Sequence, residues 1–315
     1  MKEIIVNKDS ANQRLDKFLA KYLNAAPKSF IYKMLRKKNI KLNSAKAQGL
    51  EILAESDTIQ IFMADETINK FRSEKKVELH SAYIDIVFED ENILICNKPR
   101  GLLTHPGASS DNDTMLSRIL AYLYKKGEYD TSVESVFTPG LCNRLDRNTT
   151  GIIVCAKTLK AAQQLNKAIS SRESEKFYKA IVIGEINSKG ALEGYLTKDK
   201  KNNIATISDS GEKSVLTEYT PICAKNGYSL LKIKLITGRS HQIRAHLSDT
   251  GHPILGDGKY GGKKDKEPSF QMLHSQGIKF FGLKGELKLH NGTEFSAPPP
   301  EDFLYYQHKL FGGAL

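Results

Sequence analysis

A polar stretch at positions 63–80 divides this chain and thereby limits the ways in which it can fold. The stretch reads MADETINKFRSEKKVELH and has no apolar periodicity, so it predicts a linker. The chain has 315 residues, which is long for one domain and sufficient for two domains with cores of their own. We therefore expect an N-terminal unit at 12–62 and a second domain at 81–315.

The N-terminal unit combines an amphipathic helix pattern with a basic surface. Leu15, Phe18, Leu19 and Tyr22 recur at the spacing of one helix face. A second helix follows, and its polar positions and exit carry the cations Lys28, Lys33, Arg36, Lys37 and Lys38. Because these cations lack acidic partners at i±4, we interpret them as a contact surface for an RNA backbone rather than as an ordinary solvated face.

The overall charge agrees with a polyanionic partner. Lys and Arg number 47 against 36 acidic residues, which gives a formal net charge of +11 and a pI near 9.2. An excess of this size favours nucleic acid as the partner, but by itself it is equally compatible with a solvated basic surface.

Several classes of protein are disfavoured by what the sequence lacks. No signal peptide and no run of 18 apolar residues is found, so we expect no membrane association. The four cysteines are isolated and indicate a reducing compartment, so we expect a cytoplasmic protein. The histidines lack metal-ligand spacing and no phosphate-binding loop is found, so we expect neither a metal nor a cofactor. The sequence leaves the oligomeric state open, and a monomer is the default expectation.

The second domain contains strand and helix patterns without a regular alternation of the two. Two strand patterns with a polar turn between them lie within 83–101, and others lie at 151–156, 176–183, 214–223 and 228–236; helix patterns lie at 116–124, 160–170 and from 241 to 247. Lys225-Asn226-Gly227 supplies a hairpin turn between two of the strands. This arrangement predicts the α+β class.

The segment most informative about chemistry is NRLDRNTTG at 143–151, which leads directly into a buried strand. An Asp146 held between Arg144 and Arg147 would be stabilised as an anion, as a nucleophile or base at neutral pH requires. Taken alone, an R-x-D-R sequence is more often an ordinary salt-bridged loop.

This segment resembles the [HN]-R-L-D-x-x-T-[ST]-G signature of the RluA/RluC/RluD-type pseudouridine synthases, which modify large-subunit ribosomal RNA and tRNA. Most members have His where Asn143 stands, and many have Asp and Ser where Asn148 and Thr150 stand. These replacements keep size and polarity. The resemblance implies that Asp146 is the catalytic residue and that Arg144 helps to displace the target base.

The other motifs of this family occur in order. ENILICNKPRGLLTHPG resembles the first motif, KFYKA resembles K-x-Y-x-A, and TGRSHQIRAH with GHPILGDGKYG fills every fixed position of the last. The resemblance implies that Tyr178 packs on the target base and that Arg244 pairs with Asp146. Taken alone, such a tyrosine is usually a core residue. The implied RNA contacts further include Arg147, Arg239, His241 and Gln242.

The N-terminal unit is similar to the S-four-type RNA-binding domain through RLDKFLAKYL, PKSFIYKMLRKKNIKLN and ESDTIQIF, with Ser56 where glycine is usual. Within the family, the segment APKSFIYKMLRKKNIKLN most resembles the RluC-type branch, which acts on large-subunit ribosomal RNA. These resemblances imply a small α/β RNA-binding module followed by a larger mixed, mainly antiparallel sheet with flanking helices. They also imply 23S ribosomal RNA as the substrate, with tRNA as the alternative. A non-catalytic RNA-binding factor and a hydrolase that uses Asp146 are the competing hypotheses.

Overall fold

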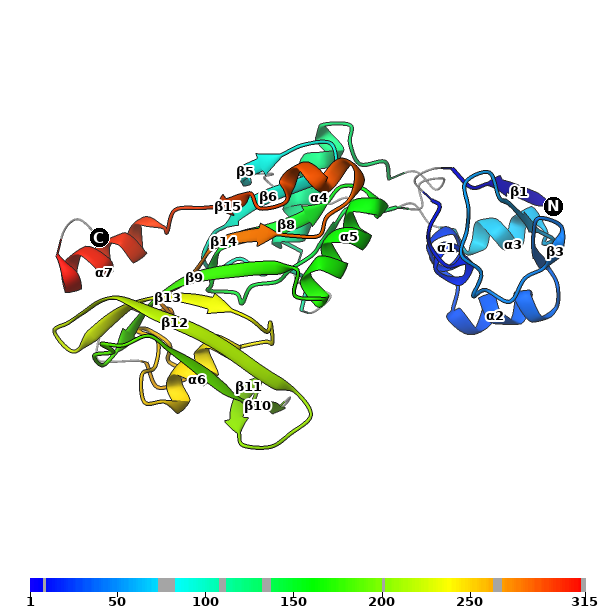
Figure 1. Ribbon diagram of the computed structural model, residues 1–315. Helices are drawn as coiled ribbons and strands as arrows, with labels where there is room; N and C mark the ends of the chain where they lie inside the picture. The colour runs from blue at the N-terminus through cyan, green and yellow to red at the C-terminus, as the bar shows by residue number, and fades with distance from the viewer. Residues whose placement is uncertain are drawn as a thin grey trace. The chain divides into compact units, whose positions relative to one another are not determined.

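The computed structural model describes residues 1–7, 10–72, 83–107, 112–131, 137–199, 202–262 and 268–312 (Figure 1). The chain forms two compact units. The first contains Met1–Ala82, Ser117–Gly140 and Ala156–Gln163, and the second contains Tyr83–Leu116, Leu141–Cys155 and Gln164–Leu315. Two internal segments of the predicted second domain therefore belong to the first unit.

The N-terminal part of the first unit is a small sheet with helices. The four strands are β1 (Lys2–Ile5), β2 (Ile40–Leu42), β3 (Ala45–Lys46) and β4 (Thr58–Ile61), in the antiparallel order β1-β4-β2-β3. The helices are α1 (Leu15–Tyr22), α2 (Lys28–Arg36) and α3 (Asp65–Lys70). The module begins earlier than the predicted residue 12, since β1 pairs with β4 and forms the edge of the sheet.

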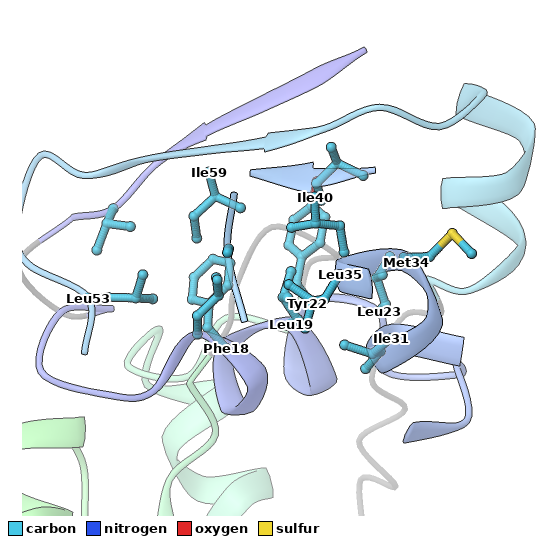
Figure 2. Packing of buried hydrophobic residues seen from close by; sticks show 14 of the residues in the cluster. Phe18, Leu19, Tyr22, Leu23, Ile31, Met34, Leu35, Ile40, Leu53 and Ile59 are labelled. Carbon is cyan, nitrogen blue, oxygen red and sulfur yellow. The ribbon is translucent and has the colours of Figure 1, made fainter. Parts of the chain in front are cut away.

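The helix faces expected from the sequence form the core of this module. All four predicted residues of α1 are buried, as are Ile31, Met34 and Leu35 of α2. Figure 2 shows Phe18, Leu19, Tyr22 and Leu35 on the side of the helices that faces Ile40 and Ile59 of the sheet, both of which are fully buried. The apolar stripe of each helix therefore packs against the sheet, which leaves the basic positions of α2 at the surface.

The expectation of a linker at 63–80 is wrong in its first part. α3 occupies Asp65–Lys70, and its Ile68 is only 2% exposed within the N-terminal core. Phe71, which follows the helix, packs on Phe30 with 4.4 Å between ring centroids. A helix of six residues has too few positions to display a repeat, so the sequence pattern missed it. Positions 73–80 lie outside the described residues.

The second unit is built on a large, mainly antiparallel sheet. Its path is β11-β10-β12-β13-β9-β14-β8-β6-β5, with β15 on β14 and β7 on β8. The strands are β5 (Asp85–Glu89), β6 (Ile93–Lys98), β7 (Gly140–Leu141), β8 (Thr150–Ala156), β9 (Ser174–Ile183), β10 (Gly190–Asp199), β11 (Ile204–Ser208), β12 (Ser214–Lys225), β13 (Tyr228–Leu235), β14 (Leu273–Phe280) and β15 (Glu294–Ser296). The β14–β8 pair is parallel. The predicted α+β class and mainly antiparallel sheet are confirmed.

The helices that follow the second-domain patterns also agree with the sequence. They are α4 (Met115–Lys125), α5 (Leu159–Ser170) and α6 (Gln242–Asp249), and the chain continues with the 3-10 helix η1 (Gly285–His290) and with α7 (Glu301–Phe311). α6 contacts β10, β11 and β12 (Figure 1). The predicted hairpin joins β12 to β13, with Asn226 and Gly227 at positive φ.

β14 brings the segments with the motifs together, although they are far apart in sequence. Its Ser275 lies opposite Tyr178 of β9 on one side and opposite Gly151 of β8 on the other. A Cβ at Gly151, whose φ is +110°, would lie 2.1 Å from the Ser275 carbonyl oxygen. Only glycine permits this close approach, so the last residue of the NRLDRNTTG segment positions the Asp146 loop beside Tyr178.

Candidate active site

Side chains anchor the start of the loop that carries Asp146, in addition to the pairing of β7 with β8 just before it. Asn143 Oδ1 accepts the Val154 amide at 2.8 Å, and its Nδ2 donates to the Ile152 carbonyl at 3.0 Å. Thr104 Oγ1 donates to the Leu145 carbonyl at 2.7 Å and accepts the Leu145 amide at 3.1 Å. The asparagine that stands where most family members have histidine therefore holds this loop on β8.

A buried lysine fixes the other side of the same loop. Lys98, at the end of β6, is fully buried, and its Nζ donates to the carbonyls of Pro99, Leu102 and Arg147 at 2.9, 2.7 and 2.9 Å. Burial lowers the pKa of Lys98 to about 7, and the charge of Asp146 acts in the opposite direction. Thr104 and Lys98 thus hold the residues immediately before and after Asp146.

Arg244 of α6 connects two carboxylates. Its Nη1 donates to Asp146 Oδ2 at 2.9 Å, while its Nε and Nη2 donate to Asp257 at 2.6 and 2.8 Å. Burial acts to lower the pKa of Arg244, but the hydrogen bonds and charges of the two carboxylates outweigh it and raise that pKa. Asp146 Oδ1 has no hydrogen-bond partner among the described residues, so this oxygen is free to contact a substrate.

His241 and Tyr260 flank this ion pair. Tyr260 Oη accepts the Ala205 amide at 2.7 Å and lies 2.9 Å from His241 Nδ1. The Tyr260 hydroxyl can therefore donate its proton to His241 Nδ1. In the neutral ring the proton is then on Nε2, which lies 3.7 Å from Asp146 Oδ2. Burial lowers the pKa of His241 against the opposing charge of Asp146. A neutral His241 leaves Arg244 as the cation paired with Asp146.

Tyr178 lines the same cavity as Asp146, and its phenol group stays protonated. The side chain is 7% exposed, and burial raises the pKa of Tyr178 to about 12, with a hydrogen bond to Ser275 acting in the opposite direction. Because the phenol stays neutral at physiological pH, its ring is the part that can act on a substrate.

Asp146 and Tyr178 line a cavity of about 520 Å³, a size typical of small-molecule and nucleotide sites. A second cavity, of about 400 Å³, also reaches Asp146 and is lined by Lys198 and Lys259. The first cavity contains most of the predicted site residues: Arg144, Asp146, Tyr178, Arg239, His241, Gln242 and Arg244. Arg147 lines only the second of these two cavities.

Gln242 differs from its expected role as an RNA contact. It is 1% exposed, and its Oε1 accepts from Thr237 Oγ1 and from the Arg239 amide at 2.8 and 3.1 Å. Its Nε2 donates to the Leu216 carbonyl and to Thr217 Oγ1, each at 3.0 Å. The amide is fully used within the protein, so Gln242 shapes the turn into α6 rather than binding RNA.

The five predicted cations of the N-terminal module all lie at the surface of the first unit. Lys28, Lys33 and Arg36 belong to α2, and Lys37 and Lys38 follow it. Within the described part of the chain, none of the five side chains makes an ion pair with an acidic group. Their positive charge is therefore not neutralised inside the module, as an RNA-binding face requires.

Sequence reasoning missed several residues that hold the site. Asp257 and Tyr260 lie in the GHPILGDGKYG stretch, whose fixed positions indicated that they matter but not what they contact. Thr104 precedes the His-Pro mark of the first motif without any signal of its own. The available hint for Asp257 was an acidic residue directly after Gly256, in the turn that follows the predicted helix with Arg244.

Two further observations concern the described residues alone. None of their helices is long and apolar enough to cross a bilayer. No group of three or more histidine, cysteine, aspartate or glutamate side chains among them is placed to hold a metal ion.

The sequence is similar to a known family model and to proteins with printed names. The family model described as RNA pseudouridylate synthase matches residues 92–249, which include Asp146, Tyr178 and Arg244. The "Uncharacterized RNA pseudouridine synthase" of Mycoplasma capricolum is 34% identical over 300 residues, covering 92% of this chain and 95% of the relative. The "Ribosomal large subunit pseudouridine synthase D" of Borreliella burgdorferi is 33% identical over 298 residues, covering 92% of this chain and 88% of the relative.

A solved structure shares the fold. "Human RNA Pseudouridylate Synthase Domain Containing 4" aligns with a TM-score of 0.54 at 22% identity, covering 72% of this chain and 93% of the human chain. "Human RNA Pseudouridylate Synthase Domain Containing 1" aligns with a TM-score of 0.51 at 20% identity. The large-subunit relative named above is a D-type synthase, and the similarity to the RluC-type branch stays a prediction.

Proposed function

Because this chain belongs to the RNA pseudouridylate synthase family and is therefore an RNA-modifying isomerase, we propose that it acts on large-subunit ribosomal RNA with Asp146 as its catalytic carboxylate. One observation carries the catalytic assignment: Asp146 is held by Arg244 at the edge of a cavity that also contains Tyr178. The large-subunit substrate is supported by the printed names of several relatives.

The reaction rearranges one nucleotide without any redox change. The N1–C1′ bond breaks, the uracil turns, a C5–C1′ bond forms, C5 loses a proton and N1 gains one. A carboxylate is sufficient for this if it attacks C1′ or stabilises positive charge there. The free Oδ1 of Asp146 is the atom proposed for this contact, and Arg244 keeps the carboxylate ionised and oriented.

A uridine in folded RNA must leave its stack before it can reach the cavity, which costs a few kcal/mol. In the proposed complex the ring of Tyr178 stacks on the extruded uracil and compensates part of that cost. Arg144, which is exposed and lines both cavities, would take the place of the base in the RNA helix. The S-four-type module would dock on the RNA through its cations on and after α2.

The experiment that tests this function maps pseudouridines in large-subunit ribosomal RNA from cells that lack the gene, by carbodiimide-dependent primer extension. We expect particular sites to disappear, to return with the wild-type gene, and to remain absent with Asp146→Asn. Sites that change in tRNA instead would assign the alternative substrate. An unchanged pattern in both RNAs would contradict the proposal and favour a non-catalytic RNA-binding factor.

A further inference from the structure

Besides Arg144 and Arg244, three further cationic side chains line the 520 Å³ cavity: Arg172, Lys176 and Arg239. Arg172 lies in the turn before β9, Lys176 lies on β9, and Arg239 lies in the turn between β13 and α6. Three separate segments of the second unit therefore contribute positive charge to the lining of one cavity.

These three side chains are not neutralised by the protein. Within the described residues, none of them makes a hydrogen bond or ion pair with a carboxylate. The nearby Glu175 is already paired with Lys234 at 2.6 Å. Burial lowers the pKa of Lys176, and the positive charge of Arg172 lowers it further. Such repulsion is relieved when an anion binds between the cations.

Two features of the backbone place these cations: an unfavourable conformation at Arg172 and a glycine at position 238. Arg172 has a φ of +62°, a left-handed conformation that is unfavourable for a residue with a Cβ. A Cβ placed on Gly238 would lie 3.1 Å from Lys176 Nζ, so the absence of a side chain there lets the ammonium approach the turn that carries Arg239. Strained positions of this kind cluster at ligand-binding sites.

The position of Lys176 relative to Tyr178 indicates which anion is bound. Residues two apart on a strand share one face of the sheet, about 7 Å apart along it. Lys176 therefore lies beside the ring proposed to stack on the target uracil, where the sugar–phosphate backbone of the bound RNA strand would pass. Lysine and arginine are the side chains that bind phosphate oxygens most strongly.

We propose that Lys176, Arg172 and Arg239 form a subsite that binds a phosphodiester of the RNA backbone next to the target uridine. This inference rests on the proposed function, because it takes the cavity as the entry site of an extruded nucleotide. The subsite binds charge on the backbone and does not read the base, so it contributes affinity and register rather than sequence selectivity.

The test uses two fluorescent hexauridylates, one with ordinary phosphodiesters and one with uncharged methylphosphonate linkages throughout. Binding is measured for the wild-type protein and for Lys176→Met, Arg172→Gln and Arg239→Gln. We expect each substitution to weaken binding of the charged hexamer about tenfold and to leave binding of the neutral hexamer unchanged. Lys176→Arg should restore most of the loss, because it restores the charge.

The matched control is Lys189→Met, which removes one exposed positive charge directly before β10, and Lys189 lines neither of the two cavities. If Lys176→Met weakens the charged hexamer no more than Lys189→Met does, or weakens both hexamers equally, the subsite is overturned. Inorganic phosphate that binds through Lys176 while hexauridylate affinity is unaffected would also overturn it, as a site for free phosphate.

Failure of the subsite and failure of the proposed function are distinguishable. Normal pseudouridine formation with a Lys176→Met protein that behaves like the control would reject the subsite alone. Charge-dependent hexamer binding through these side chains, in a protein that forms pseudouridine in neither ribosomal RNA nor tRNA, would support the subsite and reject the proposed function.

Discussion

The Arg244 guanidinium donates from Nη1 to Oδ2 of Asp146 at 2.9 Å, across a sequence separation of 98 residues. The same guanidinium is held from its other edge by two hydrogen bonds to Asp257, whose side chain is 1% exposed. Arg244 therefore cannot follow Asp146 if the carboxylate moves. The orientation of Asp146 is set by α6 and by the turn that carries Asp257.

Replacing Asp257 with Asn should slow the chemical step and leave substrate binding nearly unchanged. We expect Asp257→Asn to lower kcat about 100-fold while KM changes little, because a small displacement of Arg244 misplaces the reacting carboxylate. Steady-state kinetics on a ribosomal RNA fragment checks this. Asp249→Asn, which removes an exposed carboxylate from α6, the helix that carries Arg244, serves as the control. A raised KM with an unchanged kcat would show that Asp257 does not position Arg244 for catalysis.

The ring of Tyr178, rather than its hydroxyl, should be the functional part. Because the pKa of Tyr178 is about 12, we expect no ionisation of this phenol in the pH–rate profile below about pH 11. Tyr178→Phe should retain activity within about tenfold, whereas Tyr178→Leu should lose a further ten- to hundredfold, the value of one base–aromatic stack. Equal losses in the two variants would assign the function to the hydroxyl instead.

His274 should make the protein less stable in mild acid. It is fully buried, 2.8 Å from Thr150 Oγ1 and 3.0 Å from the Ala297 carbonyl, and burial lowers the pKa of His274 to about 4 from its ordinary 6.5. Between these values the unfolded chain binds one proton more than the folded one. Stability therefore falls as pH falls through this window, by about 3 kcal/mol in total.

Urea unfolding between pH 8 and pH 4 measures this loss. We expect His274→Gln to flatten the pH dependence by most of that amount, since a glutamine does not titrate. His308→Gln, which replaces an exposed histidine of α7, should leave the wild-type slope in place. If His274→Gln and the wild type lose stability in parallel, another group is responsible.

The cations on and after α2 should act on RNA affinity and not on chemistry. Lys33→Gln and Lys37→Gln should each reduce the steepness of the dependence of log Kd on log salt by about 0.7 to 0.9, one phosphate contact, with kcat at saturating RNA unchanged. Fluorescence anisotropy at several salt concentrations gives this slope. Lys70→Gln removes an exposed charge from α3 of the same unit as a comparison, and an equal effect of all three variants would indicate a non-specific response.

Local patterns determined much of this protein in advance. The spacing of Leu15, Phe18, Leu19 and Tyr22 predicted a helix face that is fully buried, because a period near 3.6 already specifies which side chains leave water. The uninterrupted apolar run at 151–156 likewise predicted a strand with both faces covered, and β8 is buried at every position. The motif residues Asp146, Tyr178 and Arg244 were identified from sequence and line one cavity.

What only the tertiary structure decided was the set of contacts between distant segments. α3 was missed because a single buried Ile68 has meaning only once the core it enters exists. The Asp257–Arg244–Asp146 chain and the cluster of Lys176, Arg172 and Arg239 depend on β14 lying between β8 and β9 and on α6 packing beside β12. A sequence pattern reports which side chains must be buried, whereas the order of strands in the sheet decides which of them meet.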